Sequence, residues 1–364
     1  MRFGKAKRFG TVAAIALLLG TALLVRHFSA GTDASARGQF LRFVPVDATS
    51  VIFVDLDELR TSPLLRSLDS WVPRVAEDSE YAQFVRDTGF DYERDLGKMF
   101  VAFSNHGATS SKLILAEGNF DRNKIESYLG RTGKAVQQGS LKVYQLPATA
   151  DGKAFCVAIF SSRRIAITDS ANLFAALSDA VRDAGRVEWQ VRFDRLAGSP
   201  VFAVVRQDPA LQQALSSAAP GGFRSPQLAT LLDQMRWISL AAKPDGQLLR
   251  LVAEGEVSSA AVATQASDFL QGIQLLAQNG LNDPKLRQQM NPEARDAYVE
   301  LLKSADIQKL DRGDSKSVRL ALTVTPQFLT IVKTLSVGPP VSPAADSASK
   351  KKQVAQMAKR GKNK

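Results

Sequence analysis

Met99-Phe-Val-Ala-Phe103 and Leu113-Ile-Leu-Ala116 are two short apolar runs separated by the polar segment Asn105-His-Gly-Ala-Thr-Ser110. Apolar runs of this length, joined by a short segment that contains glycine, predict a β-hairpin. A hairpin pairs its strands antiparallel, and the strands need a helix or a second sheet to cover their apolar face. This stretch therefore sets the expectation for the fold.

The same pattern returns later in the chain. Trp237-Ile-Ser-Leu240 and the mainly apolar run 248–253 flank the turn Pro244-Asp-Gly246. Residues 99–118 align with 236–255 without a gap, at an offset of 137, and both segments end in Ala-Glu-Gly. Recurrence of one unit at a fixed offset predicts an internal duplication.

Elements of both kinds surround each hairpin. In the first half we expect strands at 51–54, 141–146, 154–160 and 164–168, and helices at 57–72, 79–88, 121–129 and 170–185. In the second half we expect strands at 201–205, 307–310 and 318–324, and helices from 208, after 226, and at 258–276, 292–303 and 326–334. Adjacent strands closed by helices predict an α+β fold with mainly antiparallel sheets, in two tandem domains at 45–186 and 198–336.

Thr11–Val25 is an uncharged apolar stretch behind the basic leader 1–10. With Phe9 and Gly10 the uncharged run has 17 residues, which as a helix spans about 25 Å, near the lower limit for a bilayer. We therefore predict a transmembrane signal anchor at 11–26 in the inner membrane, followed by a linker at 27–44. The positive residues before it place the N-terminus in the cytoplasm and the ectodomain in the periplasm. Cleavage of the segment as a signal peptide, for instance near Ala34-Ser-Ala36, stays open and would give a secreted protein.

The net charge of +11 belongs to the two ends of the chain. Residues 1–26 carry +5 and residues 341–364 carry +6, which leaves 11 − 5 − 6 = 0 for residues 27–340. A neutral globular part argues against a nucleic-acid-binding fold. The tail 337–364 is predicted to be disordered, with a contact to anionic lipid or an acidic envelope polymer. The basic residues of that contact are Lys350, Lys351, Lys352, Lys359, Arg360, Lys362 and Lys364.

The chain has few of the residues that common catalytic sites and metal sites need. The chain has one cysteine, Cys156, in an apolar strand-like run, and two histidines, His27 and His106. A zinc site of nitrogen and sulfur ligands or a Ser-His-Asp triad does not follow from so few residues. Gly130-Arg-Thr-Gly-Lys134 resembles a phosphate-binding loop, but its spacing is wrong and Ala135 replaces the required Ser or Thr. We predict no catalytic residue, no metal site and no cofactor.

Six charged positions are candidates for a structural or a functional role. Asp55 and Asp57 would share a face if the strand continued, as a divalent cation or an acid–base pair requires. The simpler interpretation makes Asp57 a helix N-cap and leaves Asp55 at the strand exit. Glu117 and Glu254 recur with the repeat and are interpreted as structural. Arg163-Arg164 is interpreted as a turn and edge charge, with contact to an anionic ligand as the alternative.

The segment Phe43-Val-Pro-Val-Asp-Ala-Thr-Ser-Val-Ile-Phe-Val-Asp-Leu56, followed by Ser62-Pro-Leu-Leu65, resembles the start of uncharacterised membrane-anchored bacterial envelope proteins. Their signature is proline, any residue, aspartate and alanine before a strand. The resemblance spans about 43–185 and includes the hairpin that leads into Ala116-Glu-Gly-Asn-Phe-Asp121. It implies a membrane location and this architecture, and it brings no catalytic residue.

Three functional hypotheses follow. The first is a non-enzymatic envelope protein whose duplicated ectodomain binds or scaffolds another envelope component. The second is a hydrolase that uses carboxylates such as Asp55 and Asp57, and the third is a binder of an apolar ligand between sheet and helices. A pocket that converges on the two aspartates would favour the hydrolase, a solid interior the scaffold, and an unfilled apolar cavity the ligand binder.

Overall fold

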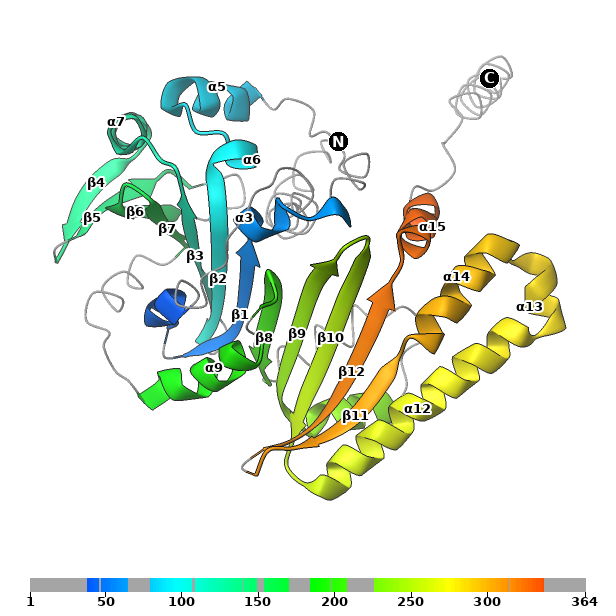
Figure 1. The fold of residues 1–364 in the computed structure, drawn as a ribbon. Helices are drawn as coiled ribbons and strands as arrows, with labels where there is room; N and C mark the ends of the chain where they lie inside the picture. Colours follow the sequence, from blue (N-terminus) through cyan, green and yellow to red (C-terminus); the bar gives the residue numbers. More distant parts are fainter. Residues whose placement is uncertain are drawn as a thin grey trace, which may run out of the picture.

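A computed structural model describes residues 38–45, 47–64, 79–106, 109–139, 141–148, 154–169, 184–196, 198–207, 226–313 and 315–336 (Figure 1). Its strands are β1 (Ala48–Asp55), β2 (Leu96–His106), β3 (Thr109–Gly118), β4 (Lys134–Gln138), β5 (Leu141–Leu146), β6 (Phe155–Ser161), β7 (Arg164–Thr168), β8 (Val201–Arg206), β9 (Met235–Asp245), β10 (Leu248–Val257), β11 (Asp306–Asp311) and β12 (Lys316–Val324). Its helices are η2 (Leu41–Phe43), α3 (Leu56–Leu59), α5 (Ser79–Thr88), α6 (Tyr92–Asp95), α7 (Arg122–Thr132), α9 (Ala184–Arg195), α11 (Pro226–Asp233), α12 (Ala260–Asn282), α13 (Pro284–Gln289), α14 (Pro292–Lys303) and α15 (Pro326–Ser336).

The strands form one 12-stranded sheet in the order β11-β12-β10-β9-β8-β1-β2-β3-β7-β6-β5-β4. Each neighbouring pair is antiparallel. The strands of the first half of the chain lie on one side of the β1–β8 pair, and those of the second half on the other (Figure 1). The predicted α+β class with antiparallel pairing is confirmed, and the two halves share hydrogen bonds through the β1–β8 pair.

Several predictions concern residues outside the described ranges. The apolar stretch 11–25, the tail 337–364, the helix after position 64, most of the one at 170–185 and the one from 208 lie there. Within the described ranges, no helix is both long enough and apolar enough to cross a bilayer.

The two hairpins match in register, and the offset between them is 139. His106 pairs with Thr109 and Asp245 with Leu248, so the turns match at 245 − 106 = 139 and 248 − 109 = 139. Each hairpin also has its register shift at the same place, at Gly97 in β2 and at 97 + 139 = 236 in β9. The offset of 137 from the sequence is thus two residues short. Side chains alternate between faces with a period of two, so an error of two leaves the apolar pattern unchanged.

One face of the sheet packs against η2 and α9. Phe53, Phe100 and Phe202 on the central strands are at most 1 % exposed and lie in one cluster with Trp189 and Phe193 of α9. Residues 38–44 were expected to belong to the linker 27–44, but Phe40 and Leu41 are buried in this cluster. Phe40 contacts the rings of Phe53 and Phe100, each with its centroid 5.6 Å away. Aromatic contacts thus draw the end of the linker into the core.

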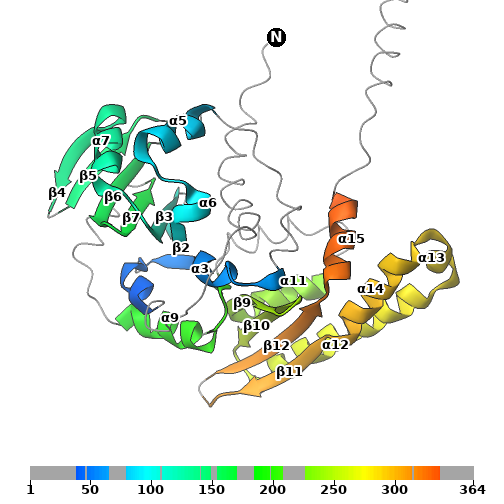
Figure 2. The same ribbon diagram turned by 45° about the horizontal axis from the view of Figure 1, so that its top comes forward.

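The opposite face is covered in three places (Figure 2). Over the first half, Ile125 and Leu129 of α7 pack on strands β5 to β7. Over the second half, α11 and α12 cover one end of the strands through Leu231 and Ala266. Leu59, Leu64 and Leu329 of α15 form a third cluster at the other end.

Some local boundaries differ from the sequence predictions. Asp55, and not Asp57, is the N-cap of α3, because its side chain accepts a hydrogen bond from the Glu58 N–H at 2.9 Å. Helix α7 continues past Gly130 to Thr132, with Gly133 as its C-cap. Gly185 lies inside α9 and does not end a helix there. Strand β4 was not predicted because Lys134–Gln138 has almost no apolar alternation.

Candidate functional site

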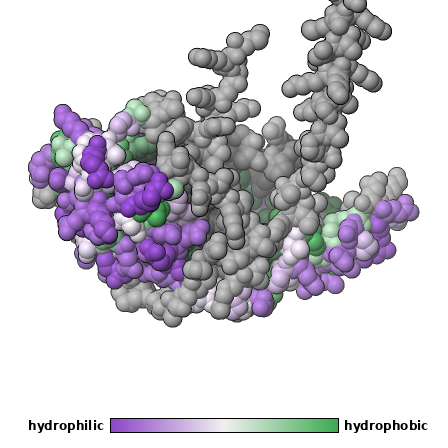
Figure 3. All heavy atoms as spheres, turned by 90° about the horizontal axis from the view of Figure 1, so that it is seen from above, coloured by the Kyte–Doolittle hydropathy of each residue, from purple (hydrophilic) through white to green (hydrophobic). Residues whose placement is uncertain are grey.

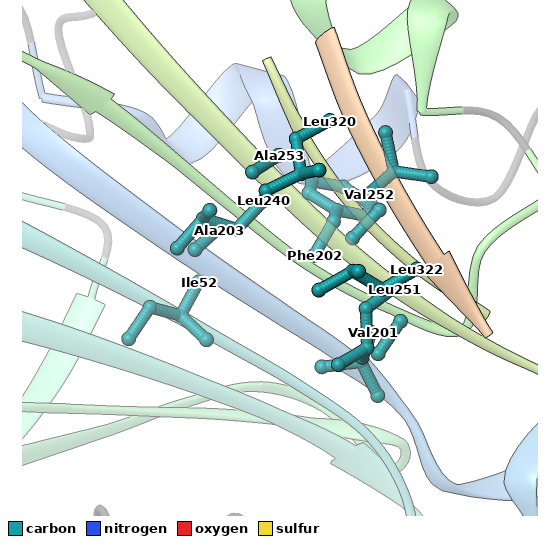
Figure 4. Close-up of a pocket in the computed structure, with 12 residues that line it drawn as sticks. Ile52, Val201, Phe202, Ala203, Leu240, Leu251, Val252, Ala253, Leu320 and Leu322 are labelled. Carbon is teal, nitrogen blue, oxygen red and sulfur yellow. The ribbon is translucent and has the colours of Figure 1, made fainter. Parts of the chain in front are cut away.

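A pocket of about 450 Å³ opens on the sheet over β1, β8, β9, β10 and β12 (Figure 4). We call it the sheet groove. Hydrophilic residues dominate the outer ends of the molecule in Figure 3, and hydrophobic ones show between them. Among the residues that the structure describes, those that line the groove are all apolar, namely Ile52, Val201, Phe202, Ala203, Leu240, Ala241, Ala242, Leu251, Val252, Ala253, Leu320 and Leu322.

The floor of the sheet groove consists of two cross-strand rows. In the first row Ile52, Ala203, Leu240, Ala253 and Leu320 are consecutive cross-strand partners. The second row is Val201, Ala242, Leu251 and Leu322, which are likewise consecutive partners. Residues two apart on a strand share a face, so both rows point to the same side of the sheet. The antiparallel register of the five strands therefore brings these side chains together on one face.

Of the helices in the described ranges, some close the groove at both ends of its strands and none covers the middle. At one end Val201 and Leu249 pack with Leu64 and with Leu329 of α15. At the other end Ile238 packs with α11 and α12. Leu240, between them, is 45 % exposed. A large apolar side chain this exposed in an apolar pocket marks a surface suited to an apolar ligand.

The aspartates singled out by the sequence lie outside this groove. The Asp55 side chain caps α3, and its Oδ2 lies 4.0 Å from Nζ of Lys98. Asp57 lies 3.7 Å from the same ammonium and 2.8 Å from Nη1 of Arg60. A Cβ on Gly97 would approach Asp57 Oδ2 to 2.5 Å, so the bulge in β2 makes room for this cluster. Because α3 starts at Leu56, the strand does not continue to Asp57, and the arrangement supports capping and ion pairing.

The densest charged cluster lies on the other face of the sheet. Glu254 is 5 % exposed and accepts hydrogen bonds from Arg312, Ser317 and Arg319. Glu256 is bound by Arg195 at 2.7 Å and by Arg192 at 2.5 Å, both from α9. Burial raises the pKa of the Glu254 carboxyl, but the hydrogen bonds from the arginines and the serine outweigh it and hold the pKa below its ordinary value. Glu254 therefore stays charged and fastens β12 to β10, and Glu256 connects α9 to the same strand.

The remaining residues make structural contacts, although two of their places differ from the sequence interpretation, because Arg164 begins β7 and Glu254 is not the counterpart of Glu117. Glu117 pairs with Arg164 at 2.6 Å, and the corrected offset makes Glu256 its counterpart (117 + 139 = 256) in place of Glu254. Arg164 also lies over the rings of Phe40 and Phe43. Cys156 is buried in β6, and burial raises the pKa of its thiol.

The other candidate positions give no convergent site. His106 ends β2 at the hairpin turn. The segment Gly130–Lys134 runs from α7 into β4, beside a second pocket of about 580 Å³ of mixed polarity. In the described ranges no three His, Cys, Asp or Glu side chains lie close enough to hold a metal ion. The basic tail residues from Lys350 to Lys364 lie outside those ranges.

No protein-family model matches the chain, and no curated protein matches it. Among solved structures, crystal form III of TP0453 is similar with a TM-score of 0.42 and 11% sequence identity, covering 84% of this chain and 100% of that one. Crystal form I of TP0453 has a TM-score of 0.40 and 12% identity, covering 81% of this chain and 96% of that one. Similarity this low carries no conclusion about function.

The sequence held one signal of the groove. The runs Trp237–Ala242 and Leu248–Ala253 are apolar at both odd and even positions. This pattern is typical of strands in a sheet that is covered on both faces. The sequence did not show that the described helices leave one of these faces open.

Proposed function

We propose that this chain is a non-enzymatic, membrane-anchored envelope protein whose ectodomain binds an apolar ligand in the sheet groove. The observation that carries the proposal is the pocket of about 450 Å³, whose lining residues within the described part of the chain are all apolar. Its volume lies in the range of small-molecule sites. Each square ångström of apolar surface removed from water contributes about 25 cal/mol, so an occupant would stabilise the complex by burying this floor.

Of the three hypotheses from the sequence, the groove favours the ligand binder. A scaffold would be favoured by a solid interior, and a hydrolase by a pocket that converges on Asp55 and Asp57. Both aspartates are engaged with Lys98, Arg60 or the α3 N-terminus, outside the residues that line the groove. Their engagement supports the non-enzymatic proposal.

The test is to extract bound material from the full chain after purification from membranes. Mass spectrometry should find an apolar compound that co-purifies with the native chain. Leu240→Glu, which places a charge on the open floor, should remove it. Leu276→Glu is the matched control, because Leu276 is 73 % exposed on α12 and lies outside the groove lining. An extract with no compound enriched over the Leu240→Glu protein would contradict the proposal.

The membrane anchor at 11–26 and the basic tail belong to the same proposal. The basic leader supports a cytoplasmic N-terminus and a periplasmic groove, and the tail would then meet anionic lipid or an acidic envelope polymer. A periplasmic reporter fused after Lys364 should be active, and a silent reporter would overturn the orientation. A pull-down of the ectodomain from envelope extract should lose partners when 341–364 are deleted, and an unchanged set of partners would end the tail proposal.

We also propose that the two halves arose by duplication. The hairpins share strand length, turn and bulge position at the offset of 139. Phe53 of β1 pairs with Phe100, and Val204 of β8 pairs with Ser239, which is the counterpart of Phe100 because 100 + 139 = 239. Phe53 and Val204 therefore occupy equivalent positions in the two halves. Ile52 and Ala203 are then equivalent and also pair with each other, as expected at a local two-fold axis. Less diverged relatives should align the β2–β3 and β9–β10 hairpins turn on turn, and a best alignment of the two halves that does not superpose these turns would contradict duplication.

A further inference from the structure

Strand β4 is the outermost strand at one end of the sheet (Figures 1 and 2). Among the described residues it pairs with β5 alone, so its other edge has no neighbouring strand. A free edge presents a row of backbone N–H and C=O groups that can pair with a further strand. The opposite end of the sheet is β11, which gives a second edge for comparison.

The β4–β5 turn decides which backbone groups face the free edge. Gln138 pairs with Leu141 across a two-residue turn, in which Gly139 has φ +57°. Residues that flank such a turn exchange hydrogen bonds, and bonded pairs alternate with non-bonded pairs along an antiparallel ladder. Alternate residues counted back from Gln138 therefore bond to β5, whereas Ala135 and Gln137 direct their N–H and C=O groups outward. No hydrogen bond among the described residues engages these outward groups.

The two edges of the sheet differ in the charges they carry. Strand β11 has three charged residues among six, and Lys309 lies near its middle. Charged side chains on an edge strand, lysine above all, hinder pairing with another chain. Strand β4 has one charge among five residues, at Lys134 where the strand begins. The β4 edge therefore lacks the protection that the β11 edge has.

The β4 edge is complementary to itself. When two copies of β4 lie antiparallel about a two-fold axis at Val136, Ala135 of each copy faces Gln137 of the other, so outward residues meet outward residues. The two pairs then exchange four backbone hydrogen bonds. Val136 meets its own counterpart as a β-branched cross-strand pair. Of the registers that a two-fold axis allows, this one pairs all the outward groups of the strand.

A buried acceptor at the end of β4 fits the same register. Gln138 Oε1 is buried and accepts no hydrogen bond from the described residues. The register places Lys134 of the second copy opposite Gln138, and this exposed lysine carries the kind of donor that the oxygen lacks. It also keeps the two Lys134 ammonium groups at opposite ends of the strand pair, so like charges do not face each other.

We infer that β4 pairs with β4 of a second copy of this chain, so that two molecules form a two-fold dimer with one continuous sheet. A two-fold interface uses the β4 edge of both copies, so assembly stops at two. The sheet groove lies over β1, β8, β9, β10 and β12, and pairing at β4 does not involve it. A pair of five-residue strands buries less than the roughly 1,600 Å² of a standard interface, so the dimer dissociates on dilution.

The first test introduces single cysteines into the full chain in detergent solution. Cys156 is replaced by alanine, so that the introduced cysteine is the only thiol. With a copper–phenanthroline oxidant, Val136→Cys should give a disulfide-linked dimer, because the two substituted positions face each other with Cα atoms about 4.5 Å apart.

Two matched positions control this cross-link. Gln138→Cys lies on the same face of β4, but its two copies are four residues apart along the paired strands, or about 14 Å, which is too far for a disulfide. Lys309→Cys lies in the edge strand at the other end of the sheet. Both variants should remain monomeric under the same oxidation.

The second test measures the dimer without a cross-link, by sedimentation velocity of the full chain across a dilution series. Gln137→Pro removes one outward N–H from each copy and no bond to β5, and should weaken dimerisation at least tenfold. Val136→Lys opposes two ammonium groups at the axis and should abolish the dimer. Lys309→Glu on β11 is the matched control and should leave it unchanged. Circular dichroism checks that each variant is folded.

Three outcomes would overturn the inference. The first is cross-linking of Gln138→Cys or Lys309→Cys equal to that of Val136→Cys, which would show random collision. The second is a chain that sediments as a monomer at every concentration and gives no Val136→Cys dimer. The third is a Val136→Cys cross-link to a different protein, which would assign the β4 edge to that partner. The two readouts are independent, so the test stays decisive if one variant fails to fold.

Discussion

The β2–β3 and β9–β10 hairpins have the same strand lengths, turn and bulge position but different surroundings. Val101 and Leu240 are equivalent at the offset of 139 and are neighbours of the β1–β8 pair on the same face of the sheet. Val101 is 7 % exposed and Leu240 is 45 % exposed. One backbone thus gives a covered sheet in the first half and an open groove in the second.

The side chains at equivalent positions follow this difference. Lys112 in β3 corresponds to Leu251 in β10, and 112 + 139 = 251. The Lys112 ammonium lies 5.3 Å from the Phe155 ring centroid, and its backbone N–H donates to Asp169 at 2.9 Å. Leu251 instead lines the groove. Backbone register sets the architecture, and substitution within it creates the site.

The largest expected effect separates the covered position from the open position on this one face of the sheet. Val101→Glu places a carboxylate at a buried position without a partner and should destabilise the fold by about 4 kcal/mol. Leu240→Glu, at the equivalent open position, should change the free energy of unfolding by less than about 1 kcal/mol. Chemical denaturation of both variants measures the difference. Equal destabilisation would show that Val101 and Leu240 are covered alike.

The second effect concerns the end of the hairpin, where Gly118 corresponds to Val257. A Cβ at Gly118 would lie 2.2 Å from the carbonyl oxygen of Asp95, whereas Val257 is buried among the residues that contact α12. Gly118→Val should therefore destabilise the protein by about 3 kcal/mol through backbone displacement.

The reciprocal change Val257→Gly should cost about 2 kcal/mol through lost burial. Thermal unfolding of the two variants tests this pair. If Gly118→Val left the melting temperature unchanged, the close approach of β3 to Asp95 would not be required for stability.

The third effect compares the ion pairs of the two halves. Glu254→Gln leaves Arg312 and Arg319 without their carboxylate and should lower the free energy of unfolding by about 2 kcal/mol. The loss is smaller than for a fully buried ion pair because these arginines are partly exposed. Glu117→Gln disturbs the single Glu117–Arg164 pair and should cost about 1 kcal/mol or less.

The Glu254 effect should depend on pH. Its folded pKa is lowered, so its stabilisation is present above the ordinary glutamate pKa of about 4.3 and is lost as pH falls through the lower folded value. The difference between native protein and Glu254→Gln should be full at pH 7 and shrink below about pH 4. Urea denaturation across this range measures it, and a difference that grows on acidification would contradict the assigned direction.

The smallest effect is at the β9–β10 turn. Gly246 has φ +61°, in the left-handed region that favours glycine, and a Cβ there meets no atom within 4 Å. Gly246→Ala should therefore destabilise through backbone conformation alone, by about 1 kcal/mol. Thermal unfolding checks this, and a stabilising effect would show that the turn adopts another conformation.

Sequence reasoning found the hairpins, the α+β class and most strands because apolar runs and turn residues report local structure directly. It placed the N-cap at Asp57 instead of Asp55, since both aspartates fit a capping position and only the start of α3 at Leu56 decides between them. It assigned residues 38–44 to a linker because Phe40 and Leu41 form no periodic pattern of their own. Their burial depends on partners more than 100 residues away, such as Trp189.

The sequence by itself determined the strand–turn–strand units, their antiparallel pairing and the neutrality of the part between the charged ends. It could not determine the offset between the hairpins, because a shift of two residues preserves the alternation of faces. Only the tertiary structure showed that Ile52, Ala203, Leu240, Ala253 and Leu320 form one row. The physical reason is that a cross-strand row depends on hydrogen-bond register between distant segments, and an open face depends on which helices fail to cover it.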